Sequence, residues 1–329
     1  LRQDFNLVHF QVGSEGREES ATGKLMRLLV SPFQFASRIL SERPDAVLLN
    51  TSLEPKAFWR DLAYLFIAKI LRTPIIYQVH GGELPETFLG RGRLAQWFTG
   101  KCLALPNIVV LLAEIERRSY ERYPAIKEIV VIPNAIDISV FGHIEAKKCN
   151  RSQLIFGYIG RLAHDKGIAE SIEALKLLKD SEDLDIRYMI AGSGPSEQTL
   201  RNLVDTLGLS DRVSFLAPIF GKEKVQFWTD IDVFLFPTYH NEGLPYTILE
   251  AMASATPTIT SEVGGIPDVI GDNVQGVFVD PHDPDAIASA IRRFVSNSAQ
   301  LRSMSVNAKK RALEHYTIKR LAAQFREVF

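Results

Sequence analysis

Two glutamates lie eight residues apart in the stretch HNEGLPYTILEAMA (residues 240–253), and their surroundings suit the recognition of a polar ligand. Glu242 precedes a glycine and a proline in a loop-like run, whereas Glu250 follows in a helix-like run. A carboxylate can accept hydrogen bonds from two neighbouring hydroxyls, such as those of a ribose. The free amides of the helix start, beside Gly243 and Leu244, could receive phosphate oxygens.

A second interpretation of these glutamates needs no ligand. Glu242 would cap the start of the helix, and Glu250 would be an ordinary surface residue. The apolar neighbours Leu249 and Met252 argue against this interpretation for Glu250, because a charged side chain among buried residues usually has a partner.

Two cations flank a short loop in the stretch GYIGRLAHDKG (residues 157–167). A strand is expected to end at Gly160, and a helix is expected to begin at Gly167. Arg161 and Lys166 would then add their charges to the dipole of the helix start, which suits a diphosphate. A solvated basic loop is the alternative.

The stretch AGSGP (residues 191–195) has the same order of strand, loop and helix, with Pro195 expected in the first helical turn. Gly192 and Ser193 would let the backbone approach a ligand closely, or would simply form a tight turn. The run does not complete the GxGxxG pattern of dinucleotide-binding proteins.

A histidine and two glycines follow an expected strand in the stretch YQVHGGE (residues 77–83). Ligands of open parallel sheets bind beyond the carboxyl ends of the strands, so His80, Gly81 and Gly82 are candidates for a substrate-facing loop. A lone histidine can equally be structural.

The sequence offers little support for a metal site. It has only two cysteines, Cys102 and Cys149, and no CxxC motif, which fits a reducing, cytoplasmic compartment. Asp-x-Asp triplets occur at 183–185, 230–232 and 283–285, but each precedes an expected strand or begins an expected helix. We therefore expect capping or solvated acids there and no metal ligands.

The elements that would carry these residues follow a repeating strand–helix order. Apolar, β-branched runs predict strands at 45–50, 74–80, 107–113, 128–133, 154–160, 185–192, 212–217, 232–237, 257–262 and 276–280. Helical patterns fall at 167–180, 195–208, 221–229, 245–254 and 283–296, and one or two amphipathic helices are expected within 299–329. Continuous apolar strands separated by helices predict an α/β fold with doubly wound parallel sheets.

Length and composition set further bounds. A chain of 329 residues favours two domains. The net charge of −1 gives no sign of a nucleic-acid partner. The most apolar run, 57–72, is interrupted by Arg60, Asp61 and Lys69, so no membrane-spanning segment is expected.

Taken together, the motifs carry a resemblance. The stretches GRLAHDKG, AGSGP, FPTYHNEGLPYTILEAMA and GGIPDVI (264–270), in this order, resemble those of retaining family-4 glycosyltransferases, and the pair Glu242 and Glu250 matches the E-x7-E pattern of that family. The stretch VVIPNAID (130–137) resembles the family's interdomain crossing. The resemblance implies the GT-B fold, with two Rossmann-like domains facing across a cleft.

The resemblance also implies domain limits and roles. Residues 1–150 would form the acceptor-side domain, 151–310 the donor-binding domain, and 311–329 a C-terminal helix that crosses back. Arg161 and Lys166 would hold the donor diphosphate together with Gly160, Gly192 and Ser193. Glu250 would bind the ribose, Glu242 the sugar with Gly243 and Leu244 nearby, and Ile219 would line the base pocket. His80, with Gly81 and Gly82, would face the acceptor.

The implied activity is metal-independent transfer of a hexosyl group from a UDP-sugar or GDP-sugar to a glycan or lipid-linked acceptor, with retention of anomeric configuration and no cofactor. Arg161, Lys166, Glu242 and His80 would be the catalytic residues, acting by electrostatic stabilisation and positioning. A noncatalytic or truncated nucleotide-sugar-binding relative and a nucleotide-sugar 2-epimerase are the alternatives.

Two expectations concern the first half of the chain. The family usually begins with a strand and a glycine-rich loop, whereas this sequence begins with Leu1 and the run 4–13 reads as a later strand, so an N-terminal truncation is expected. Basic and aromatic residues are mixed in 24–43, 56–72 and 91–101. This surface could contact the inner face of an anionic membrane, or could supply ordinary helix core faces.

Overall fold

The structure is a computed structural model that describes residues 5–12, 20–147, 153–182 and 184–329. The chain forms two compact units, of which unit 1 comprises Leu1–Ile132 and Ala322–Phe329, and unit 2 comprises Pro133–Leu321. The division falls inside the 130–137 stretch. The roles and limits expected for 1–150, 151–310 and 311–329 stay predictions.

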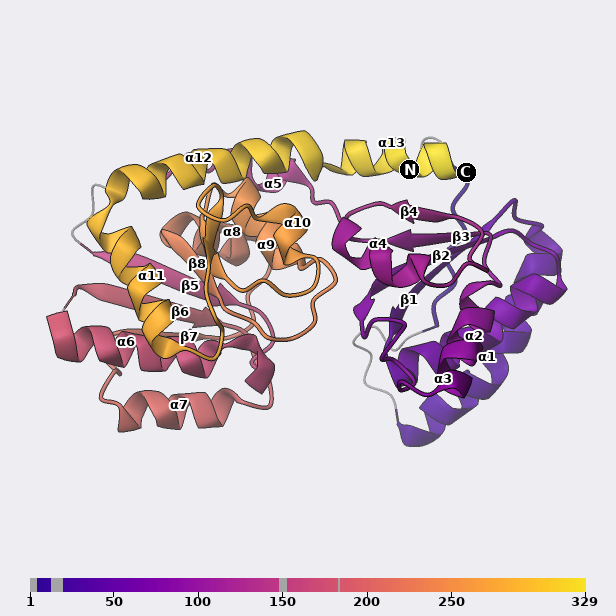
Figure 1. Cartoon of the computed structure of the whole chain (residues 1–329), viewed down its shortest axis with the longest axis horizontal. Helices are drawn as coiled ribbons and strands as arrows, with labels where there is room; N and C mark the ends of the chain where they lie inside the picture. The colour runs from indigo at the N-terminus through magenta and orange to yellow at the C-terminus, as the bar shows by residue number, and fades with distance from the viewer. Residues whose placement is uncertain (1–4, 13–19, 148–152, 183) are drawn as a thin grey trace. The chain divides into compact units, whose positions relative to one another are not determined.

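Unit 1 is a parallel sheet with helices around it (Figure 1). Its strands, in the sheet order β1-β2-β3-β4, are Val47–Leu53, Ile75–Gly82, Ile108–Leu111 and Ile129–Val131. Its helices are α1 (Ala21–Glu42), α2 (Pro55–Ile70), α3 (Arg93–Leu103) and α4 (Glu114–Glu121). The final helix α13 (Ile318–Val328) ends in this unit, where the rings of Phe5 and Phe329 lie 4.9 Å apart.

Unit 2 is a larger parallel sheet in the order β10-β9-β8-β5-β6-β7. Its strands β5 to β10 are Leu154–Ile159, Ile186–Ala191, Val213–Leu216, Val233–Phe236, Thr258–Thr260 and Gly276–Phe278. Its helices are α5 (Ile138–Phe141), η1 (His164–Lys166, a 3-10 turn), α6 (Ile168–Glu182), α7 (Glu197–Thr206), α8 (Gly221–Asp230), α9 (Tyr246–Ala253), α10 (Ile266–Val269), α11 (Pro284–Ser296) and α12 (Ser298–His315).

The strand order of unit 2 creates a switch point between β5 and β8. The chain leaves β5 toward β6 and β7 on one side, then crosses back to β8 on the other side. Loops that follow such neighbouring strands diverge, and ligands of doubly wound sheets bind in the crevice between them. In unit 2 these loops are 160–167 and 237–245, which contain the basic loop and the first glutamate of the E-x7-E pair.

The predicted α/β class with two parallel sheets is confirmed, and each of the ten predicted strands is present within a few residues of its expected limits. The strand expected at 4–13 is wrong for residues 5–12, which form no ladder; Phe10 instead packs its ring against Phe35 and Tyr64. Residues 4 and 13 lie outside the described part. Pro195 precedes α7, which begins at Glu197 after a turn.

The basic and aromatic segments of unit 1 divide between core and surface. Phe35 and Phe58 are buried in the hydrophobic core. Phe33, Trp59 and Trp97 are more than half exposed on α1, α2 and α3. The core interpretation therefore holds for Phe35 and Phe58, while contact of the exposed side chains with a membrane stays a prediction. In the described part of the chain, no helix is long and apolar enough to cross a bilayer.

Candidate functional site

The loops that follow β5 and β6 are joined by backbone hydrogen bonds. The Gly160 amide donates to the Ala191 carbonyl at 3.0 Å, and the Leu162 amide donates to the Ser193 carbonyl at 2.9 Å. A Cβ atom on Gly192 would come within 1.9 Å of the Gly160 carbonyl oxygen, so only glycine permits this approach. The structure thus brings the predicted residues Gly160, Gly192 and Ser193 together.

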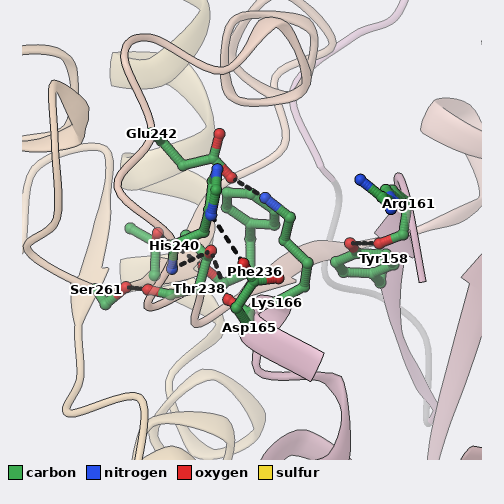
Figure 2. Close-up of polar contacts among 10 residues, drawn as sticks. Tyr158, Arg161, Asp165, Lys166, Phe236, Thr238, His240, Glu242 and Ser261 are labelled. Atoms are coloured by element: carbon green, nitrogen blue, oxygen red, sulfur yellow. Dashed lines mark hydrogen bonds and ion pairs between the residues drawn. The ribbon is translucent and has the colours of Figure 1, made fainter. Parts of the chain in front are cut away.

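The loops that follow β5 and β8 meet at the carbonyl of Asp165. It accepts hydrogen bonds from the Tyr239 amide, the His240 amide and the Thr238 hydroxyl, each at 3.1 Å. The Asp165 carboxylate also lies 2.8 Å from the His240 Nδ1 atom. Figure 2 shows Asp165, Thr238 and His240 as one cluster beside Lys166. The two loops at the switch point are therefore fastened together.

Lys166 and Glu242 form an ion pair between these loops. The Lys166 Nζ atom lies 2.6 Å from Glu242 Oε1, and the two side chains are only 14% and 17% exposed. Glu242 accepts no capping hydrogen bond from the start of α9, so the capping interpretation is wrong. The pair sets a positive and a negative group side by side at the switch point (Figure 2).

The backbone around Glu242 is held from two sides. The Gly265 amide donates to the carbonyls of Glu242 and Gly243 at 3.0 and 2.9 Å. The side-chain amide of Asn134 donates through Nδ2 to the Leu244 carbonyl at 2.8 Å. Gly243 and Leu244 are themselves buried, which makes the start of α9 a firm support for the Glu242 side chain.

Glu250 is buried and paired with a lysine that sequence reasoning missed. Its Oε1 atom accepts a hydrogen bond from Lys224 Nζ at 2.6 Å, while its Oε2 atom is buried with no hydrogen-bond partner in the described structure. Burial raises the pKa of Glu250, and Lys224 followed by the Trp228 indole opposes that rise. The interpretation of Glu250 as a surface residue is wrong, because its side chain is 11% exposed.

Arg161 and Ile219 lie farther from these contacts. Arg161 is exposed and stands apart from the Lys166–Glu242 pair in Figure 2, where its carbonyl accepts the Tyr158 hydroxyl at 2.8 Å. Burial raises the pKa of Tyr158, so this hydroxyl stays protonated. Ile219 is partly exposed in the loop between β7 and α8, just before the 75% exposed Phe220.

His80, Gly81 and Gly82 belong to unit 1. They form the end of β2, and His80 Nε2 lies 3.1 Å from Asn50 Oδ1 in the neighbouring strand β1. Desolvation by the surrounding chain lowers the pKa of His80, which favours its neutral form near pH 7. Their predicted contact with the acceptor stays a prediction.

The acidic residues considered as metal ligands have other contacts. Asp232 accepts a hydrogen bond from the Ile155 amide at 2.9 Å, and Asp283 caps α11 through the Ala286 amide at 3.0 Å. Across the described ranges, no group of three or more His, Cys, Asp or Glu side chains could hold a metal ion. Cys102 is buried and free, while Cys149 and Asp183 lie outside the described residues.

The contacts that sequence reasoning missed join residues far apart in the chain. Lys224 and Glu250 are 26 residues apart, and Lys166 and Glu242 are 76 residues apart. Lys224 lies on α8, a helix that the apolar pattern does predict. Whether its side chain faces α9 depends on how the two helices pack against each other. No local signal in the sequence reports that register.

The model of the family described as Glycosyl transferases group 1 matches residues 143–311, just over half of the chain. A 2-deoxystreptamine glucosyltransferase from Streptomyces kanamyceticus is 30% identical over 282 residues, which cover 79% of this chain and 71% of that protein. The chain therefore belongs to the group 1 family of glycosyl transferases, which is the retaining family 4 that its motifs resemble.

Other relatives and structures agree. An uncharacterized glycosyltransferase of Methanocaldococcus jannaschii is 33% identical over 172 residues, covering 52% of this chain and 43% of that protein. The chain thus spans less than half of that relative. Anabaena HepE, solved in complex with UDP-glucose, superposes with a TM-score of 0.73 at 17% identity, covering 91% of this chain and 81% of that one. This likeness establishes the GT-B fold.

Proposed function

We propose that the protein is a retaining glycosyltransferase that moves a hexosyl group from a nucleoside-diphosphate sugar to a glycan or lipid-linked acceptor without a metal ion. The observation that carries the proposal is the pairing of Lys166 with Glu242 between the two loops at the switch point of unit 2. The UDP-glucose named with the Anabaena structure supports a UDP-sugar as the donor.

The phosphates would bind where cations and free amides meet. Lys166 follows β5 in the short turn η1, beside the loop that leads into α9. A diphosphate arriving there would compete with Glu242 for the ammonium group, and it carries more charge than one carboxylate. Arg161, exposed in the same loop, would supply a second cation.

The reaction would then depend on stabilising the leaving group. As the glycosidic bond breaks, negative charge grows on the diphosphate and positive charge grows on the sugar. Lys166 and Arg161 would stabilise the first, and Glu242, released from its ion pair, would orient the sugar hydroxyls and face the second. Glu242 is thereby a positioning carboxylate in this scheme, and His80 would contribute from the acceptor side.

The experiment that tests this function is a transfer assay with UDP-sugars and GDP-sugars in the presence of a chelator. We expect release of nucleoside diphosphate that falls about 100-fold or more in Lys166→Ala and Glu242→Ala, as for loss of an electrostatic group from an active site. Lys222→Ala is the matched control, because Lys222 is an exposed lysine of the same unit. Equal rates in all variants would refute the roles assigned here.

We further propose that the exposed apolar side chains of α1 to α3 contact the surface of an anionic membrane, which would bring the enzyme to a lipid-linked acceptor. Phe33 is 77% exposed, Leu94 83% and Trp97 62%. Cations occur on the same helices, among them Lys24 and Lys101. Apolar side chains beside cations suit the interface of a bilayer that contains anionic lipids.

Vesicle co-sedimentation tests the membrane contact. We expect binding to vesicles of phosphatidylcholine with phosphatidylglycerol, less binding to phosphatidylcholine alone, and a loss of several-fold in Trp97→Glu. Val306→Glu is the control, since Val306 is a 48% exposed apolar residue of unit 2. Binding that does not depend on anionic lipid, or that the two variants lose equally, would refute the contact.

A further inference from the structure

The Glu250 carboxylate is held by one helix and presented by another. Glu250 lies on α9, and its partner Lys224 lies on α8, the helix that follows the β7 loop. The ammonium group contacts only one carboxylate oxygen, Oε1, at 2.6 Å. The second oxygen, Oε2, is buried and has no hydrogen-bond partner within the described chain. The arrangement leaves half of a charged acceptor unsatisfied.

The Trp228 indole also favours the ionised carboxylate, but no hydrogen bond to Oε2 replaces the water that this oxygen has lost, which is costly for the folded protein. Such a group is expected where a ligand supplies the missing donor. A lysine at hydrogen-bond distance limits the rotation of the carboxylate and favours its ionised form, while its own side chain, 28% exposed, keeps N–H groups for a second partner.

We infer that Lys224 is a positioning residue for nucleotide recognition, and that Lys224 and Glu250 act as one unit toward the vicinal hydroxyls of the donor ribose. Glu250 accepts a hydrogen bond from one hydroxyl, and Lys224 keeps the carboxylate ionised and oriented for it. The inference rests on the proposed function, since it takes a nucleoside diphosphate as the ligand. It adds a residue that the E-x7-E pattern does not contain.

A ligand lacking one hydroxyl tests the inference. Isothermal titration would compare UDP with 2′-deoxy-UDP, and GDP with 2′-deoxy-GDP, on the wild type and on Lys224→Met, Lys224→Arg and Glu250→Gln. Lys222→Met is the matched control, because Lys222 is exposed two residues earlier on the same helix. Thermal unfolding of each variant would establish that it folds.

The wild type is expected to bind the ribonucleotide about tenfold or more tightly than its 2′-deoxy form, as for a hydrogen bond to a charged group. Lys224→Met should abolish that preference, mainly by weakening the binding of the ribonucleotide. Lys224→Arg should restore most of it, and Lys222→Met should leave it unchanged.

Two results would overturn the inference, and they are distinguishable. One is a folded Lys224→Met variant that keeps the preference for the 2′-hydroxyl, or that binds both nucleotide forms equally more weakly. Lys224 would then have only a structural role or a general electrostatic one, and the proposed function would stand. A wild type that binds neither UDP nor GDP would remove the proposed function, and the inference with it.

Discussion

The two glutamates of the E-x7-E pair have opposite surroundings. Glu242 lies in a loop against Lys166, at the point where two loops meet. Glu250 lies on a helix, where burial raises its pKa and Lys224 opposes the rise. Each carboxylate has a lysine from another segment, so neither is set up as a free nucleophile. Their different surroundings would suit two different contacts with one extended ligand.

Variants of the Lys166–Glu242 pair are expected to affect the stability of the fold and the binding of UDP differently. Lys166→Met leaves the mostly buried Glu242 carboxylate without its partner, so we expect the free energy of unfolding to fall by about 1–3 kcal/mol, between the values for exposed and buried pairs. Lys166→Met with Glu242→Gln should recover most of that loss. Affinity for UDP should stay at least tenfold reduced in both variants, because the cation is absent.

Urea unfolding and calorimetric titration of the single and double variants would measure the two effects. A double variant that regains both stability and affinity for UDP would show that Lys166 acts only through Glu242.

At the scale of elements, the site depends on how closely three loops approach one another. The loop before α10 passes directly beneath the Glu242 backbone, where Gly264 has a φ of +52° and a Cβ atom would lie 1.6 Å from the Glu242 carbonyl oxygen. Gly208, after α7, has a φ of +64° with no heavy atom within 4 Å of the same position. The two glycines share a backbone conformation and differ in their surroundings.

This contrast gives a prediction for two alanine variants. Gly208→Ala should cost about 1–2 kcal/mol of unfolding free energy, which is the strain of a left-handed alanine. Gly264→Ala should cost about 1–3 kcal/mol more, because the added methyl group displaces the Glu242 loop. Urea unfolding measures both, and equal costs would contradict the close packing of this loop.

Elements were predicted well from local pattern, and contacts between elements were not. The strand runs at 154–160 and 232–237 are visible as apolar, β-branched segments, and so are the loops that follow them. The run 5–12 has a similar composition but pairs with no strand, and the ring of Phe10 packs against α1 and α2. The composition of a segment indicates whether it is buried. Whether it pairs as a strand depends on neighbouring segments, which the local sequence does not identify.

The candidate site shows the same division. Lys166 and Glu242 stand out in the sequence because they lie in loops after predicted strands, and Glu250 stands out because it interrupts an apolar helical run. Lys224 does not, since a lysine in the first turn of a helix is common on protein surfaces. Its role appears only when α8 and α9 pack and bring its ammonium group to 2.6 Å from Glu250.

At the scale of the whole molecule, two compact units with one parallel sheet each and the group 1 family match define the class of protein. Unit 2 holds the predicted donor residues, of which Lys166 and Glu242 pair at the switch point, and unit 1 holds His80 at the end of β2. Transfer would need both a donor site and an acceptor site. The proposal of a transfer reaction therefore needs a test that goes beyond nucleotide binding.

The most direct test of that claim is proton NMR of the protein incubated with a nucleoside-diphosphate sugar and a glycan or lipid-linked acceptor, with a chelator present. We expect equal amounts of free nucleoside diphosphate and of a glycoside whose anomeric coupling constant matches that of the donor. A 2-epimerised sugar, a glycoside of inverted configuration, or donor binding with no turnover across the panel would contradict the proposal.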